Sequence, residues 1–459
     1  MMNANFNNTG STNENIFELV SENPLNVSKL YEVFTQMNTV DIAEIFERLS
    51  RDKAIQIFRL LPKSIAADVF SYIEPDNQQV IVEALTDIEV AKIMDELFVD
   101  DAVDFIEEMP ANVVKRVLLH ADETKRRFIN QFLQYPEDSA GGIMTAEYVD
   151  LREDAKVREA FDYIRRTGLD KETIYTCYVI RRDKLLVGAI SAKTLMLANP
   201  HERIGDIMDK NIIFAQTTDD QEAIANLFKK YGLVSLPVVD KERRLVGIVT
   251  VDDAVQIIEE EATEDFEIMA AVKPSDETYL KTSVLRHSRN RIMWLMVLML
   301  TAMVTQIIIE RYEDALLAIP ILAAFIPMLM DTAGNAGSQS ATLIIRGMAV
   351  GEILVRDVFK VIWKEVRVAL LCGLALGSVN FTRVFLMNGM DADAALLSLT
   401  ITITVIITVF LAKTVGCLLP IGAKLIKIDP AIMAAPLITS IVDATALIAY
   451  FSIAMAILY

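Results

Sequence analysis

Apolar and polar positions follow a helical pattern over the first part of the chain. Residues 15–137 carry apolar side chains at helical spacing, as in VDIAEIFERLS and IEVAKIMDELF, and show no strand alternation. LLPKSIAADVFSYI (60–73) and EMPANVVKRVLLHA (108–121) both place a proline before an apolar helix. This repeat predicts an all-α domain built as a small stack of helical hairpins. The polar residues 1–14 before it are predicted to be a disordered leader.

A second repeat, of about 64 residues, begins near residue 138. AGGIMTAEYVDLREDAKVREAFDYIRR is echoed by IGDIMDKNIIFAQTTDDQEAIANLFKK, and IYTCYVIRRDKLLVGAISAKTLM by LVSLPVVDKERRLVGIVTVDDAV. Each unit reads strand, helix, strand, turn, strand, helix, and the second strand pair predicts an antiparallel hairpin. The repeat resembles a tandem pair of cystathionine-β-synthase (CBS) modules, at 138–200 and 201–262. That resemblance implies an α+β regulatory unit that often binds adenine nucleotides. Thr217, Thr218 and Asp219 would suit the ribose or phosphate of ATP.

The last third of the chain is apolar in long stretches. Ile292 to Ile309 runs 18 residues without a charge, which is long enough to span a bilayer as a helix. Further apolar segments lie at about 315–345, 366–387, 394–423 and 430–458. The pattern predicts a five-helix transmembrane domain over 291–459, preceded by a connecting helix at 263–290.

The loops around these segments differ in charge. Basic residues, Lys281 among them, gather before the first span, between the second and third, and between the fourth and fifth, whereas ERYEDA and NGMDADA on the other side are acidic. Cytoplasmic loops carry the excess of Lys and Arg. The N-terminal part is therefore predicted to be cytoplasmic, and the C-terminus to lie outside the cell.

Composition adds to this picture through charge. Residues 1–285 hold 31 basic and 52 acidic side chains, and residues 286–459 hold 13 and 11. A polyanionic domain does not favour nucleic acid, whose phosphates need Lys and Arg, and divalent cations are better partners. The three cysteines (Cys177, Cys372 and Cys417) fit neither a zinc motif nor a disulfide framework. No P-loop and no nucleophile–base arrangement occurs, so an enzyme is not expected.

Ionisable residues inside apolar segments point to an ion pathway, because a charge in hydrocarbon costs at least ~2.5–3.5 kcal/mol. The second span holds a polar group within FIPMLMDTAGNAGSQSATLIIR, namely Asp331, Asn335, Ser338 and Gln339. The fifth holds Asp443, with Thr439 on the same helical face. A helix-packing notch explains the first group equally simply, and a hydrogen bond from a protonated Asp443 the second.

Two further charged residues in this region each have two interpretations. Asp429 either caps a helix that begins at Pro430 or belongs to a pore. Lys413 either pairs with an intramembrane carboxylate or extends to the membrane surface.

An acidic run occupies the predicted helix after the second CBS module. Its members are Asp252, Asp253, Glu259, Glu260, Glu261, Glu264 and Asp265. Like charges four residues apart destabilise an isolated helix. A solvated face is the ordinary explanation, but a hard divalent cation could also neutralise these oxygens and draw helices together.

The order of these segments resembles the MgtE family of bacterial magnesium channels over nearly the whole chain. The most specific matches are FIPMLMDTAGNAGSQSATLIIR, DPAIMAAPLITSIVDATAL and EEATED. The resemblance implies a homodimer in the bacterial cell membrane, with a pore on its two-fold axis. It implies that Asp443 recognises hydrated Mg²⁺ there, and that cytosolic Mg²⁺ closes the pore. By motif match the regulatory Mg²⁺ ligands are Asp253, Glu261, Glu264 and Asp265, with Asp220 and Glu222 as similar candidates. Acidic residues of the helical domain, such as Asp95, Asp100 and Asp101, could face the connecting helix and bind the same ion.

This sequence departs from the family pattern at two positions. Asp331 stands where a glycine is expected, which would add a carboxylate to the pathway. Gln256 stands where another sensor carboxylate is common, which would weaken regulatory Mg²⁺ binding or move the gating threshold. The function predicted is a Mg²⁺-selective channel-type importer. An ion-coupled divalent cation transporter and a membrane-anchored nucleotide or metal sensor are the alternatives, and selectivity among Mg²⁺, Mn²⁺, Co²⁺ and Ni²⁺ stays open.

Overall fold

The computed structural model describes residues 19–20, 25–275, 279–280, 282–387, 391–433 and 435–458. They form two compact units, Met1–Ile258 and Glu259–Tyr459, and each unit is considered by itself. The leader predicted at 1–14 lies outside the described residues, as do Lys281 and part of the NGMDADA loop.

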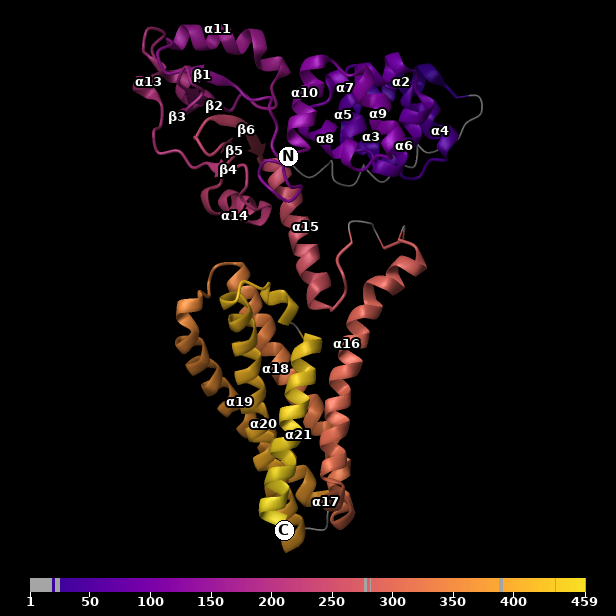
Figure 1. The fold of residues 1–459 in the computed structure, drawn as a ribbon, viewed down its shortest axis with the longest axis vertical. Coiled ribbons are helices and arrows are strands. Elements are labelled where there is room, and N and C mark those ends of the chain that lie inside the picture. Colours follow the sequence, from indigo (N-terminus) through magenta and orange to yellow (C-terminus); the bar gives the residue numbers. More distant parts are fainter. Residues whose placement is uncertain are drawn as a thin grey trace, which may run out of the picture. The chain divides into compact units, whose positions relative to one another are not determined.

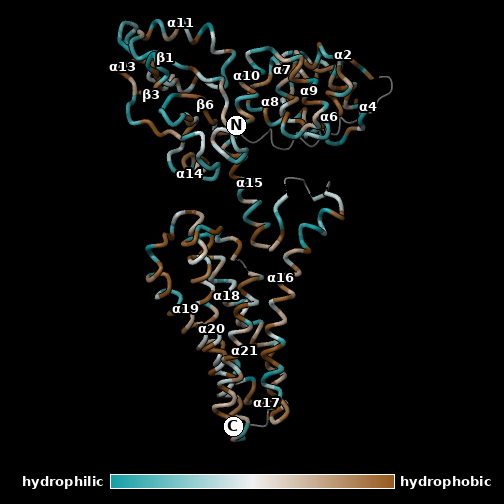
Figure 2. The backbone as a smooth tube through the Cα atoms, viewed as in Figure 1, coloured by the Kyte–Doolittle hydropathy of each residue, from teal (hydrophilic) through white to brown (hydrophobic). Residues whose placement is uncertain are grey.

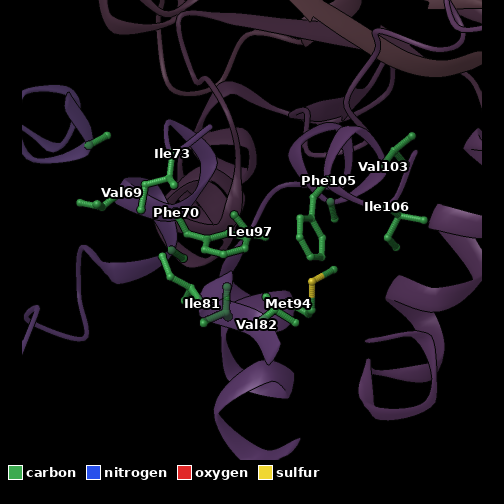
Figure 3. Close-up of a cluster of buried hydrophobic side chains, with 14 of the residues drawn as sticks. Val69, Phe70, Ile73, Ile81, Val82, Met94, Leu97, Val103, Phe105 and Ile106 are labelled. Carbon is green, nitrogen blue, oxygen red and sulfur yellow. The ribbon is translucent and has the colours of Figure 1, made fainter. Parts of the chain in front are cut away.

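The first unit begins with a helical domain (Figure 1). Its helices are α2 (Val27–Gln36), α3 (Thr39–Phe46), α4 (Arg51–Phe58), α5 (Ala66–Ser71), α6 (Pro75–Ala84), α7 (Asp87–Glu96), α8 (Val99–Glu107), α9 (Ala111–His120) and α10 (Glu123–Phe132). Helices two apart in the sequence pack together, as α3 does with α5, α5 with α7 and α8 with α10. Figure 3 shows part of the shared core, where the rings of Phe70 and Phe105 meet edge to face with centroids 5.2 Å apart. The predicted all-α domain is confirmed.

Two small sheets of the same design follow. The first contains β1 (Asp150–Arg152), β2 (Thr176–Ile180) and β3 (Leu186–Ser191), and the second β4 (Ala215–Gln216), β5 (Ser235–Val239) and β6 (Leu245–Thr250). In each, the first pair is parallel and the second antiparallel, with a bulge at the same place. Their helices are α11 (Val157–Thr167), η1 (Gly168–Asp170), α12 (Ala192–Leu197), α13 (Ile204–Ile207) and α14 (Gln221–Tyr231). The predicted CBS pair and its hairpin are confirmed.

Each CBS module completes the sheet of the other. Thr145, which precedes the first sheet, pairs antiparallel with Ile248 of β6, and Asp209, which precedes the second, pairs with Ala189 of β3. Close packing beside these bridges requires glycine. A Cβ atom on Gly247 would lie 2.7 Å from the sulfur of Met144. Gly188 meets Met208 in the same way.

Several of the remaining helices are long and apolar (Figure 2). The remaining helices are α15 (Val251–Met269), α16 (Val284–Arg311), α17 (Glu313–Ala318), η2 (Pro320–Phe325), α18 (Ile326–Ala349), η3 (Val355–Asp357), α19 (Val358–Met387), α20 (Ala392–Leu425), η4 (Pro430–Met433) and α21 (Ala435–Leu458). Among the residues that the structure describes, four helices are long and apolar enough to cross a membrane: α16, η3–α19, α20 and α21. With 24 residues α18 is also long enough, but its central small and polar residues make it less apolar than those four.

Several predicted helix boundaries differ from the structure, and two of the differences change how the chain is divided. The apolar segment 315–345 is not one helix, since Pro320 starts a separate 3₁₀ turn and α18 begins only at Ile326. The connecting helix predicted at 263–290 starts earlier, at Val251, and ends at Met269. Ala271 adopts the left-handed φ of 56° that terminates helices. Pro274 follows and cannot continue a helix. A new helix then begins at Val284, whose N-cap is Ser283.

Candidate functional site

Helix α18 lies between α20 and α21 at very close range, because glycines face both neighbours. A Cβ atom on Gly416 of α20 would collide with the carbonyl oxygen of Gly337. A Cβ atom on Gly334 would lie 2.9 Å from the Thr439 methyl group of α21. The glycines of the predicted segment therefore serve helix packing, as the packing-notch interpretation expects.

The polar residues of α18 point elsewhere. Asp331, Asn335 and Gln339 are exposed, whereas Gly334, Gly337 and Ser340 are buried. The three exposed residues follow at four-residue intervals and so form one stripe along the helix. We call them the α18 polar stripe. In a membrane such a stripe cannot face lipid without a large cost, and a water-filled path or another protein surface must cover it.

Asp443 of α21 lies next to this stripe. Its Oδ1 atom is inaccessible to solvent and has no hydrogen-bond partner among the residues that the structure describes. Asp331 is the charged group whose field acts on it. Beside it, the hydroxyl groups of Ser338 and Thr439 lie 3.3 Å apart and link α18 to α21. Two carboxylates and several neutral oxygens thus gather between α18 and α21, which is a donor set that suits a hard cation.

A second group of carboxylates lies in the first unit, between the helical domain and the CBS pair. We call it the buried acidic cluster; its members are Asp100, Asp101, Glu147, Glu172 and Asp253. Asp100 and Asp101 stand in the first turn of α8, and Asp253 in the first turn of α15. The Oδ2 atom of Asp253 accepts hydrogen bonds from the hydroxyl (2.6 Å) and amide (3.2 Å) groups of Thr250. The start of α15 thereby holds Asp253 in place.

Burial raises the pKa of four members of this cluster, namely Asp100, Asp101, Glu172 and Asp253. Burial, followed by the charge of Asp253, raises the pKa of Asp101 to about 7 and that of Glu172 to about 8. Burial and the charge of Asp101 raise the pKa of Asp100 well above its usual range. Lys125 supplies a nearby positive charge, with its ammonium group donating to the backbone carbonyls of Asp95 and Leu97. The cluster therefore holds more negative charge than its surroundings neutralise.

Two oxygens of the cluster have no hydrogen-bond partner among the described residues. Oδ1 of Asp100 and Oε2 of Glu172 are inaccessible to solvent and lack a hydrogen-bond partner in the described part of the chain. Within those residues, no group of three or more His, Cys, Asp or Glu side chains has the arrangement of a preformed metal site. Carboxylates that repel one another need to move only slightly to share a cation, and Mg²⁺ can also bind them through its water molecules.

Comparison with known proteins places these features in a family. The family profile described as "Divalent cation transporter" (MgtE) matches residues 326–453, "MgtE intracellular N domain" matches 37–138 and "CBS domain" matches 204–260. The chain is 36% identical over 433 residues to "Magnesium transporter MgtE" of Thermus thermophilus, covering 94% of this chain and 95% of the relative. The chain belongs to the MgtE family. It is a multi-pass membrane protein of a magnesium transporter family, and not of an enzyme family.

Two solved structures of magnesium transport proteins resemble about half of the chain. "Crystal structure of the soluble part of a magnesium transporter" is 26% identical, covers 55% of this chain and 99% of that one, and has a TM-score of 0.51. "Crystal structure of the cytosolic domain of the Mg2+ channel MgtE in complex with ATP" is 36% identical, covers 49% and 92%, and has a TM-score of 0.47.

The regulatory residues predicted by resemblance to MgtE proteins are not all brought together. Asp100 and Asp253 meet in the buried acidic cluster, whereas Asp95 is exposed. Asp220 caps α14 by accepting from the amide of Glu222 at 2.9 Å, and both side chains are exposed. The other three predicted ligands lie further along α15, in the second unit, namely Glu261, Glu264 and Asp265.

The residues predicted to hold ATP are engaged by the chain itself. The amide of Gly141 donates to the carbonyl of Thr217, which is buried, and that of Ala140 to the carbonyl of Asp219. The Asp219 carboxylate accepts from the amide of Gln216 at 2.8 Å. Thr218 is exposed.

The two membrane charges left open by the sequence now have observed contacts. Asp429 caps η4 by accepting from the amide of Ala431 at 2.8 Å. Lys413 is buried 4.0 Å from Glu365 and does not extend to the surface. Sequence reasoning missed Glu365, Glu147 and Glu172, because single carboxylates outside any motif carry no local signal of burial.

Proposed function

We propose that this protein is a Mg²⁺-selective channel that works as a homodimer in the bacterial cell membrane. In this proposal the first unit is cytosolic and the C-terminus lies outside. The observation that carries it is the exposed α18 polar stripe beside Asp443, whose Oδ1 atom has no hydrogen-bond partner among the described residues. A second subunit placed over the stripe would enclose a polar path and shield it from lipid.

The ion would cross this path with most of its water. Mg²⁺ sheds its hydration shell reluctantly, so Asp443 and Thr439 would bind it through water molecules. The side chains of the stripe, Asp331, Asn335 and Gln339, together with Ser338, would line the approach. Binding through water is weak enough to let the ion leave, which conduction requires. The membrane potential supplies the driving force, worth about 2.3 kcal/mol per elementary charge for each 100 mV.

We further propose that cytosolic Mg²⁺ closes the channel through the buried acidic cluster. Without the ion, repulsion among the carboxylates favours separation of the helical domain from the CBS pair. With the ion, the compact arrangement is favoured, which is a shift of population by differential affinity. The remaining predicted ligands would add Mg²⁺ in the same way (Asp95, Asp220, Glu222, Glu261, Glu264 and Asp265).

The experiment compares wild type with Asp443→Ala in liposomes that contain a Mg²⁺-sensitive dye. Asp393→Ala, an exposed carboxylate near the start of α20, is the matched control. We expect uptake by wild type and the control, its loss in Asp443→Ala, and inhibition by millimolar Mg²⁺ on the side of the first unit. Uptake by Asp443→Ala at the wild-type rate would remove this residue from the pathway.

Ion-coupled transport is the alternative, and a pH gradient distinguishes it. A channel keeps its Mg²⁺ uptake when the gradient is collapsed at constant membrane potential, whereas a proton-coupled transporter loses it. ATP binding at Thr217, Thr218 and Asp219 stays a prediction. Nucleotide titration of wild type and Asp219→Ala is its test.

A further inference from the structure

The membrane unit contains a buried polar group with no part in the path described above. We infer that Ser340, Glu365 and Lys413, which we call the membrane triad, hold α18 in the rotation that presents its polar stripe to the ion. The inference rests on the proposed function, because it takes the stripe as part of the path. Its members are positioning residues: they act on the ion only through α18.

The triad joins three helices by direct contacts. The Ser340 hydroxyl of α18 donates to Oε2 of Glu365 in α19 at 2.6 Å. The Lys413 ammonium group of α20 lies 3.3 Å from the same hydroxyl and 4.0 Å from the carboxylate. The side chains of Lys413 and Glu365 are only 6% and 12% exposed. The opposite charges of Lys413 and Glu365 leave a group that is neutral as a whole and largely buried.

The triad lies on the buried side of α18. Ser340 follows Gln339 of the stripe directly, but consecutive helix residues point about 100° apart, and only Gln339 is exposed. One turn away, Gly337 touches Gly416 of α20 through its backbone. That contact joins two glycines, so it has no side chain that would resist a rotation of α18 about its axis. The triad supplies this resistance to rotation, because a hydrogen bond to a charged group has a defined direction.

A rotation of α18 would matter because the stripe is narrow. Residues Asp331, Asn335 and Gln339 share one face, and turning the helix would move all three away from Asp443 together. The ion would then meet apolar surface on one side of the path. We therefore expect loss of the triad to weaken Mg²⁺ uptake even where folding is preserved.

Two variants separate positioning from folding. Ser340→Ala removes the bridging hydroxyl and keeps the ion pair. The double variant Lys413→Met/Glu365→Leu replaces the buried pair by apolar side chains, which often preserves stability because no charge stays unpaired. The matched control is Asp357→Asn/Lys360→Met, which removes an ion pair of 2.9 Å between Asp357 at the end of η3, 23% exposed, and Lys360 near the start of α19, 85% exposed. Each variant is reconstituted for Mg²⁺ uptake, and its thermal unfolding is measured in detergent.

We expect both triad variants to unfold near the wild-type temperature. We also expect them to need about tenfold more Mg²⁺ for half-maximal uptake, because the loss of one hydrogen bond to a charged group corresponds to about this factor. The control should match wild type in both measurements. Uptake at the wild-type level by both triad variants would overturn the proposal. A second refuting result is uptake that depends on pH in wild type and in Ser340→Ala but not in the double variant, because Glu365 would then be a proton carrier. Absence of any Asp443-dependent uptake in wild type would instead refute the proposed function.

Discussion

Replacing Asp101 by asparagine is expected to stabilise the first unit when no Mg²⁺ is present. Burial and the charge of Asp253 raise the pKa of this carboxyl from 3.8 to about 7. The folded state therefore binds more protons than the unfolded state between these two pH values. Its stability falls as the pH rises through this window, and the penalty is complete above about pH 7.

The magnitude follows from the same pKa. At 1.36 kcal/mol per pH unit, the difference between 3.8 and about 7 corresponds to about 4 kcal/mol. That figure is an upper limit, because water penetration and relaxation of neighbouring carboxylates reduce the penalty. We expect Asp101→Asn to gain about 2 kcal/mol near pH 8 and almost nothing near pH 4.

Hydrogen exchange of the full-length protein in detergent measures this directly. Protection of the amides in α8 and β6 should rise in Asp101→Asn near pH 8, and addition of Mg²⁺ should protect wild type more than the variant. Glu96→Gln, which alters an exposed carboxylate at the end of α7, should leave protection unchanged. The reasoning would be refuted if Asp101→Asn lowered protection near pH 8, since the carboxylate would then be a net stabilising group.

Three further outcomes are expected. Gly416→Ala should destabilise the membrane unit by about 1–3 kcal/mol in thermal unfolding, because the new methyl group meets the Gly337 carbonyl and neither backbone can move away. The control is Gly422→Ala, which should match wild type because a Cβ atom at Gly422 would have no neighbour within 4 Å. Asp331→Gly should raise the Mg²⁺ concentration for half-maximal uptake, and an unchanged value would exclude this carboxylate from the path. Mg²⁺ binding to the buried acidic cluster should release protons near pH 7 and few above about pH 9, since the pKa values of Asp101 and Glu172 are about 7 and 8. The released protons are taken up by the buffer, so a binding enthalpy near pH 7 that is the same in buffers of different ionisation enthalpy would contradict this prediction.

Periodicity predicted the fold well because it is a local property. The helical domain, the CBS repeat and the apolar helices each follow from spacing that recurs within a few residues. Helix ends were less predictable. The break at Pro320 lies inside one continuous apolar stretch, and the end of α15 depends on the left-handed conformation of Ala271.

The candidate sites show where sequence reasoning stops. Asp443 could be recognised from the sequence alone, because a carboxylate within a long apolar segment is unusual. Glu172 stands among ordinary polar residues, and only the fold carries it into the buried acidic cluster. Lys413 was noticed but could not be assigned, since its partner Glu365 comes from another helix and follows no fixed spacing.

The exchange of bridges between the two CBS modules has a consequence for how the chain can be cut. Thr145 belongs to one module by sequence and to the other by pairing, and Asp209 mirrors it. A protease that cleaves the exposed connection near His201 would sever the polypeptide without releasing either half. For the same reason neither module alone can bury its sheet edge, so gene fragments that encode one module should aggregate unless the other is co-expressed.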